Sequence, residues 1–97
     1  MIGPTPPIHP GEILTEEFLK PMGLTASALA RTCKASRTRI ERFALGQTPV
    51  TGDLALRLGR VFRTGPEFWM NLQALHDLTE VAAIVHDLDG IEPLVPA

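Results

Sequence analysis

The sequence of 97 residues contains a single cysteine, no tyrosine and only 5% aromatic residues. One thiol, Cys33, cannot form a disulfide within the chain, and the three histidines are too scattered for a metal site. No apolar run approaches the roughly 18 residues of a membrane-spanning helix, and the N-terminus lacks the basic start and apolar middle of a secretory signal. We therefore expect a cytoplasmic protein without a disulfide, metal, other cofactor or membrane partner.

Positive charge is also missing from the last third of the chain, which has no Lys or Arg after Arg63 but six acidic residues. Residues 31–63 hold eight of the nine Lys and Arg residues, against only Glu41 and Asp53. The net charge of −2 argues weakly against nucleic-acid binding, which depends on neutralising phosphates. The segregation beneath that average instead predicts a basic and an acidic surface with different partners.

Catalytic patterns are absent as well. The sequence shows no Ser-His-Asp, Cys-His or paired-carboxylate set at suggestive spacing, so we do not expect an enzyme. With 44% hydrophobic and 21% charged residues over this length, the chain should form one globular domain around one core.

Apolar residues at helical spacing, interrupted by glycine and proline, predict an all-α fold of five helices. Residues 1–7 should form a flexible arm, residues 8–86 the domain, and residues 87–97 an acidic, proline-containing tail, either disordered or a short extended arm. We expect the first helix to begin at His9 or Pro10 and the last at Pro66. The three helices between them should begin at the caps Thr25, Ser36 and Thr51.

The fifth predicted helix carries more apolar surface than four preceding helices need. Its stripe runs from Phe68 to Val85, over roughly 18 residues at helical spacing. We expect the surplus to contact a second copy of the chain. The predicted homodimer interface consists of Leu75, Leu78, Ala82 and Val85.

The segment TASALARTCKASRTRIERFALG, beginning at Thr25, has the pattern of a helix-turn-helix over about residues 25–45. Ala30 stands where the two short helices would cross, Ala35 closes the turn, and Ile40 would anchor the second helix in the core. In such a motif the exposed face of the second helix enters the major groove of DNA.

The flanking sequences, HPGEILTEEFLKPMGLT before the motif and TGDLALRLGRVFRTGPEFWMNLQALHDL after it, resemble the HigA and VapI branch of the lambda-repressor-like (XRE) superfamily. The resemblance covers residues 8–79. It implies a five-helix domain with a longer C-terminal helix that homodimerises on palindromic operator DNA and represses its own operon. It also implies neutralisation of a HigB-type toxin of the RelE-like ribonuclease class. The alternative is a stand-alone XRE-family regulator without a toxin partner.

The resemblance also implies which side chains contact DNA. Outward residues early in the recognition helix read bases, which assigns Arg37, Thr38 and Arg42 to the base edges. The residues expected to hold phosphates are Thr25, Ser27, Ser36, Arg39 and Gln47.

Three positions depart from the pattern of this branch. Lys34 stands where the turn usually has glycine, and we expect the turn to differ, because a left-handed non-glycine residue costs about 1 kcal/mol. Ala26 replaces a phosphate-clamping glutamine, and GQTPVT at 46–51 replaces GKRGIT. Two cationic phosphate contacts are thus missing, which predicts weaker and less salt-dependent DNA binding.

Other polar and aromatic residues have structural interpretations. We expect Arg57, Arg60 and Arg63 to pair with acids of the first helix such as Glu16 or Glu17. Trp69 should fill the core, and Cys33 should be a buried, inert thiol. The acidic residues near the C-terminus either maintain solubility or face a basic ribonuclease.

Overall fold

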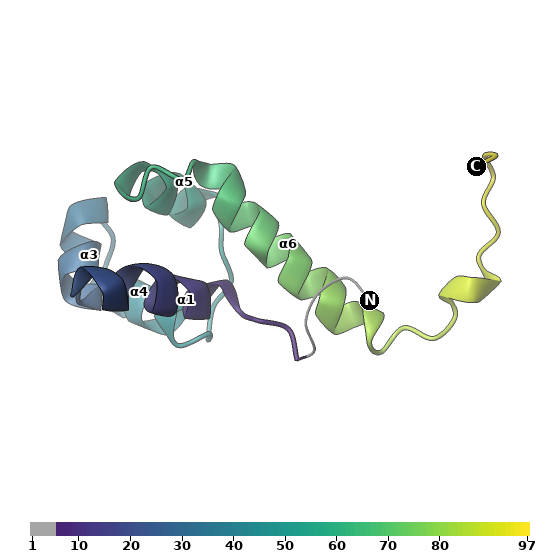
Figure 1. Ribbon diagram of the computed structural model, residues 1–97, viewed down its shortest axis with the longest axis horizontal. Coiled ribbons are helices and arrows are strands. Elements are labelled where there is room, and N and C mark those ends of the chain that lie inside the picture. Colours follow the sequence, from purple (N-terminus) through teal and green to yellow (C-terminus); the bar gives the residue numbers. More distant parts are fainter. Residues whose placement is uncertain (1–5) are drawn as a thin grey trace.

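The computed structural model describes residues 6–97, and all regular structure in that range is helical (Figure 1). The elements are α1 (Pro10–Ile13), η1 (Leu14–Leu19, a π-helical stretch), α2 (Lys20–Met22), α3 (Ala26–Cys33), α4 (Arg37–Ala44), α5 (Gly52–Val61), α6 (Pro66–Ala82) and η2 (Leu88–Gly90, a 3₁₀ turn). The segments α1, η1 and α2 follow without a break, which confirms five helices with a longer last one. No helix within residues 6–97 is long and apolar enough to cross a membrane.

Four helices begin at a side chain that caps them, and the sequence predicted three of these caps, Thr25, Ser36 and Thr51. His9 Nδ1 accepts a hydrogen bond from the Gly11 backbone N–H at 2.8 Å and opens α1. The hydroxyls of Thr25, Ser36 and Thr51 accept from backbone N–H groups at 3.1, 3.2 and 3.2 Å and open α3, α4 and α5. Each such cap contributes typically about 1 kcal/mol.

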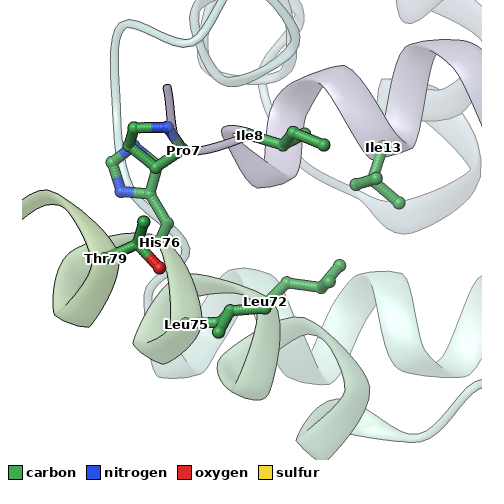
Figure 2. A pocket seen from close by; sticks show the side chains of 7 residues that line it. All are labelled: Pro7, Ile8, Ile13, Leu72, Leu75, His76 and Thr79. Carbon is green, nitrogen blue, oxygen red and sulfur yellow. The ribbon is translucent and has the colours of Figure 1, made fainter. Parts of the chain in front are cut away.

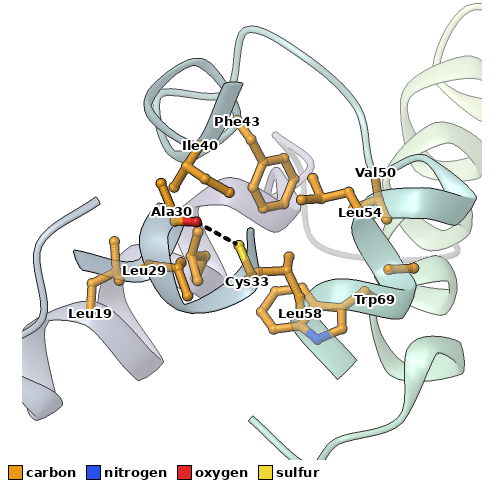
Figure 3. Packing of buried hydrophobic residues seen from close by; sticks show 12 residues of the cluster. Leu19, Leu29, Ala30, Cys33, Ile40, Phe43, Val50, Leu54, Leu58 and Trp69 are labelled. Atoms are coloured by element: carbon orange, nitrogen blue, oxygen red, sulfur yellow. Dashed lines mark hydrogen bonds between the residues drawn. The ribbon is translucent and has the colours of Figure 1, made fainter. Parts of the chain in front are cut away.

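The core lies where η1, α3, α4, α5 and the beginning of α6 meet (Figure 3). Its largest fully buried side chains include Trp69, Phe43, Ile40 and Leu58. The Trp69 indole N–H donates to Thr64 Oγ1 at 2.9 Å, so this polar atom is paired inside the core. Trp69 is 0% and Cys33 5% exposed, which confirms the expected burial of the indole and of the thiol.

Close contact between α1 and α4 depends on Gly11. A Cβ built at this position would lie 1.8 Å from the carbonyl oxygen of Phe43, near the C-terminal end of α4. Only a glycine lets the two backbones approach this closely. The HPGE sequence therefore provides a cap at His9, a first-turn proline and a contact surface for the recognition helix.

Beyond its first turns α6 runs away from the core towards an exposed C-terminal segment (Figure 1). An apolar groove of about 210 Å³ lies between residues 7–13 and α6 (Figure 2). It is lined in part by Pro7, Leu75 and Thr79, whose buried hydroxyl has no hydrogen-bond partner among the described residues. Of the expected N-terminal arm, residues 1–5 lie outside the described residues, and Pro7 borders this groove.

Candidate nucleic-acid interface

Helices α3 and α4 form the predicted helix-turn-helix, and Lys34 provides the turn between them. Lys34 has φ 57° and ψ 42°, the left-handed conformation that glycine usually adopts. The Ala35 N–H then donates to the Ala30 carbonyl oxygen at 3.0 Å, which closes the end of α3. The expectation that the turn would differ was therefore wrong, because lysine adopts the glycine-like geometry.

The residues predicted to read bases share the outer face of α4. Arg37, Thr38 and Arg42 are all exposed. Arg37 Nε lies 2.7 Å from Glu41 Oε1, an ion pair one helical turn apart. Arg42 has no ion-pair partner among residues 6–97. Arg42 and Thr38 are one turn apart, so a single approach to α4 can reach both.

A groove of about 380 Å³ runs beside this face, between α4 and the start of α5. Ser36, Thr38, Arg39 and Arg42 line one side, and the loop after α4 contributes Thr48 and Pro49, with Thr51 and Leu54 from the start of α5. The groove thus joins base-reading and phosphate-binding candidates.

The phosphate candidates are distributed around the motif. The Thr25 and Ser36 hydroxyl oxygens accept cap hydrogen bonds, which leaves each O–H able to donate. Ser27 Oγ accepts from Arg31 Nη1 at 3.4 Å, and Gln47 is exposed in the turn after α4. Arg39 is engaged elsewhere, since its Nη1 lies 2.7 Å from Asp53 Oδ2 on α5.

His9 links the loop after α4 to α6. Its ring lies 5.8 Å from that of Phe43 and 5.3 Å from that of His76, measured between centroids. Burial and the neighbouring His76 lower the pKa of His9, while a hydrogen bond with the Thr48 backbone and the charge of Asp77 act in the opposite direction. Because His9 Nδ1 accepts the hydrogen bond from the Gly11 N–H, it carries no proton in the cap, and the neutral ring is the form that caps α1.

Comparisons with known proteins identify the family. No family model matches the chain. Virulence-associated protein I of Dichelobacter nodosus is 45% identical over 92% of this chain and 82% of its own length. The antitoxin HigA of Pseudomonas aeruginosa, solved with the higBA promoter, is 41% identical, with a TM-score of 0.81 over 92% of this chain and 99% of that chain. The chain belongs to the HigA and VapI family.

The protein in a further Pseudomonas aeruginosa structure, a complex with an 18 bp operator DNA, is 42% identical to this HigA-family chain. Its TM-score is 0.86, over 91% of this chain and 97% of that chain. The resemblance carried by the HPGEIL element and the PEFWMNLQALHDL element is thereby confirmed.

Within this HigA-family domain, sequence reasoning missed the role of Arg57. It does not pair with Glu16 or Glu17 as expected; Glu16 pairs with Lys20 at 2.7 Å. Arg57 Nη1 instead donates to the carbonyl oxygens of Cys33 and Lys34, at 3.0 and 3.1 Å. The Asp53–Arg57 spacing of four residues was the available signal, because such pairs meet on one helix face.

Asp53 forms ion pairs with two arginines, Arg39 and Arg57. Arg57 Nε lies 3.0 Å from Asp53 Oδ2, the same oxygen that Arg39 contacts. Hydrogen bonds from Arg57 and then Arg39 lower the pKa of this carboxyl. Arg60 and Arg63, the other two arginines expected to meet helix-one acids, have no ion pair within the described range. The expected pairing of all three with Glu16 or Glu17 was therefore wrong.

Proposed function

We propose that this protein is an antitoxin that binds operator DNA as a homodimer, represses its own operon and neutralises a HigB-type ribonuclease toxin in the cytoplasm. The observation that carries the proposal is the exposed face of α4, with Arg37, Thr38 and Arg42 beside an open groove. The HigA structure with which this chain shares 41% identity was solved with promoter DNA.

The energetics of α4 favour base reading. To reach a base, Arg37 has to release Glu41, and an exposed ion pair of this kind contributes only about 0–1 kcal/mol. A bidentate arginine–guanine contact provides about 1–3 kcal/mol of discrimination. The exchange is therefore favourable. Hydroxyls at Thr25, Ser27 and Ser36, with Gln47 and Arg39, would fix the register on the phosphates.

The apolar surface of α6 supports the proposed dimer. Leu75 and Leu78 are 39% and 55% exposed, and Ala82 is also exposed. They form an apolar stripe on α6, where Leu75 also borders the groove towards residues 7–13. Val85 was expected on the same helix, but it lies beyond the end of α6 at Ala82 and is half-buried. We expect this stripe to pack on its copy in a second protomer, since a two-fold dimer matches a palindromic operator.

The dimer is tested by measuring the molecular mass of the Leu78→Asp variant by analytical ultracentrifugation at micromolar concentration. We expect a monomer, because a charge within the apolar stripe would have to be buried unpaired. Met70→Asp is the matched control, since Met70 is 42% exposed about two turns earlier on the same helix. Two dimeric variants would place the interface elsewhere.

The toxin contact is proposed for the acidic end of the chain. A ribonuclease binds RNA phosphates and presents basic surface, whereas this chain has no Lys or Arg after Arg63. Co-expression with the product of the neighbouring short basic reading frame should give a stable complex. If no such frame exists or no complex forms, the protein is a stand-alone regulator.

Operator binding is tested by titrating the protein against its own promoter duplex and a scrambled duplex of equal length, at several salt concentrations. We expect promoter binding tighter by about 10³-fold with a marked salt dependence. Arg42→Ala should lose much of that preference. Arg60→Ala is the control, because Arg60 is exposed on α5 outside the proposed interface. Equal, weak binding of wild type to both duplexes would refute the function.

A further inference from the structure

The Asp53 carboxylate and its arginine partners connect the two helices of the helix-turn-helix, α3 and α4, with α5. Asp53 Oδ2, near the start of α5, accepts from Arg39 Nη1 of α4 at 2.7 Å and from Arg57 Nε of α5 at 3.0 Å. Arg39 Nη2 also donates to Thr51 Oγ1 at 3.2 Å, the hydroxyl that caps α5. Arg57 continues the connection to the last carbonyls of α3. We call Asp53, Arg39 and Arg57 the ionic hub.

The hub acts on the least favourable backbone of the motif. Lys34 is left-handed, and only glycine adopts that conformation without a penalty. The carbonyl groups at the end of α3 also lack helical partners there. Arg57 supplies charged hydrogen bonds to the Cys33 and Lys34 carbonyls, where a cation is favourable at a helix C-terminus.

The placement of acidic residues supports a structural role for the hub. The basic stretch 31–63 contains only Glu41 and Asp53 as acids. A carboxylate beside a phosphate-binding groove repels DNA unless it is neutralised, and Asp53 meets two guanidinium groups. Arg57 has its side chain 36% exposed and commits Nε and Nη1 to protein partners, which makes it poorly placed as a DNA contact.

We propose that Asp53 and Arg57 are positioning residues for operator recognition, which hold the turn at Lys34 and the axis of α4 in the geometry that reads bases. The inference rests on the proposed DNA-binding function. Base contacts need the reading side chains held within about 0.5 Å, whereas phosphate contacts tolerate small rotations of α4. Loosening the hub should therefore reduce the preference for operator DNA while leaving non-specific affinity and folding nearly intact.

The test measures the affinity of each variant for the promoter duplex and for the scrambled duplex at one salt concentration. Arg57→Gln should reduce the ratio of the two affinities roughly tenfold, as expected for one weakened base contact. Asp53→Asn should reduce the ratio too, while its affinity for the scrambled duplex stays equal or rises. Arg60→Gln is the control: Arg60 is exposed on the same helix, three residues after Arg57, and its substitution should leave the ratio unchanged.

A rescue variant separates positioning from direct contact. Lys34→Gly in the Arg57→Gln background should restore most of the ratio, because glycine adopts the left-handed turn without help. Failure of this rescue, or an unchanged ratio in both Arg57→Gln and Asp53→Asn, overturns the inference. An equal loss for both duplexes in Arg57→Gln also overturns it, since that pattern marks a phosphate contact.

The two levels of the proposal fail differently. If wild type does not distinguish the duplexes, operator binding is wrong and the hub has no recognition role. If wild type distinguishes them and the hub variants do so equally well, only the positioning role is wrong. Thermal unfolding of each variant excludes loss of fold as the cause, and Asp53→Asn provides the readout if Arg57→Gln does not fold.

Discussion

Replacing Gly11 with alanine should separate α1 from the recognition helix. The new Cβ would meet the Phe43 carbonyl oxygen at 1.8 Å, its carbonyl carbon at 2.9 Å and His9 Nδ1 at 3.1 Å. Two of these atoms belong to the backbone of α4, and the third is the cap of α1. None is the free end of a flexible side chain, so the contact is relieved only by moving one helix.

The size of the effect follows from two opposing contributions. Alanine has a better intrinsic helix propensity than glycine, by about 1 kcal/mol. The clash is larger, because the shortest contact has to grow from 1.8 Å to at least 3.0 Å. Overpacking usually costs about 1–3 kcal/mol and occasionally more. A backbone contact of 1.8 Å puts the cost at the upper end of that range, so we expect a net loss of about 2 kcal/mol, which lowers Tm by about 8–16 °C in a domain of this size.

Gly52→Ala is the matched control, since a Cβ at Gly52 meets nothing within 4 Å in the first turn of α5. It changes the unfolded chain in the same way as Gly11→Ala. Thermal and urea unfolding followed by circular dichroism should show Gly52→Ala as stable as wild type or more so. If Gly11→Ala is equally stable, the close contact between α1 and Phe43 is wrong.

Three further predictions concern single side chains. Because the pKa of His9 is lowered, the unfolded chain takes up a proton near pH 6.5 before the folded one, and stability should fall as the pH drops through that value. His9→Asn keeps a cap acceptor and should remove this part of the pH dependence in urea unfolding; an unchanged pH profile would contradict the assignment. Thr64→Val leaves the buried Trp69 N–H unpaired and should cost about 1–3 kcal/mol, whereas wild-type Tm would mean that the N–H finds another partner. Thr79→Val removes a buried hydroxyl that has no partner within residues 6–97 and should stabilise the fold by about 1 kcal/mol; a lower urea midpoint would show that the hydroxyl is bonded.

Local features of the sequence predicted the helices well, and contacts distant in sequence were harder. Thr25, Ser36 and Thr51 mark helix starts because a cap bonds within three residues of itself. The partners of Arg57 are main-chain carbonyls 23 and 24 residues away. Every residue has a carbonyl, so no residue type indicates this contact. Because this contact could not be foreseen, the turn at Lys34 was predicted only from the energetic cost of a left-handed lysine.

Arg39 illustrates a second limit. Its outward position on a basic helix fits a phosphate contact, and it fits an ion pair with Asp53 equally well. Charge alone does not separate the two, since both partners are anions. The fold places the start of α5 beside α4 and so forms the ion pair, while the phosphate contact of Arg39 stays a prediction.

The distribution of charge along the molecule also affects how it approaches DNA. The chain measures 50 × 24 × 21 Å, with α3, α4 and α5 towards one end and the acidic C-terminal segment at the other (Figure 1). Each protomer is therefore an electric dipole along its long axis. Near a polyanion such as DNA it experiences a torque that turns α4 towards the duplex before any contact forms. A larger fraction of collisions then has the productive orientation, which raises the association rate at low salt. The same torque leaves the acidic end pointing away from the duplex.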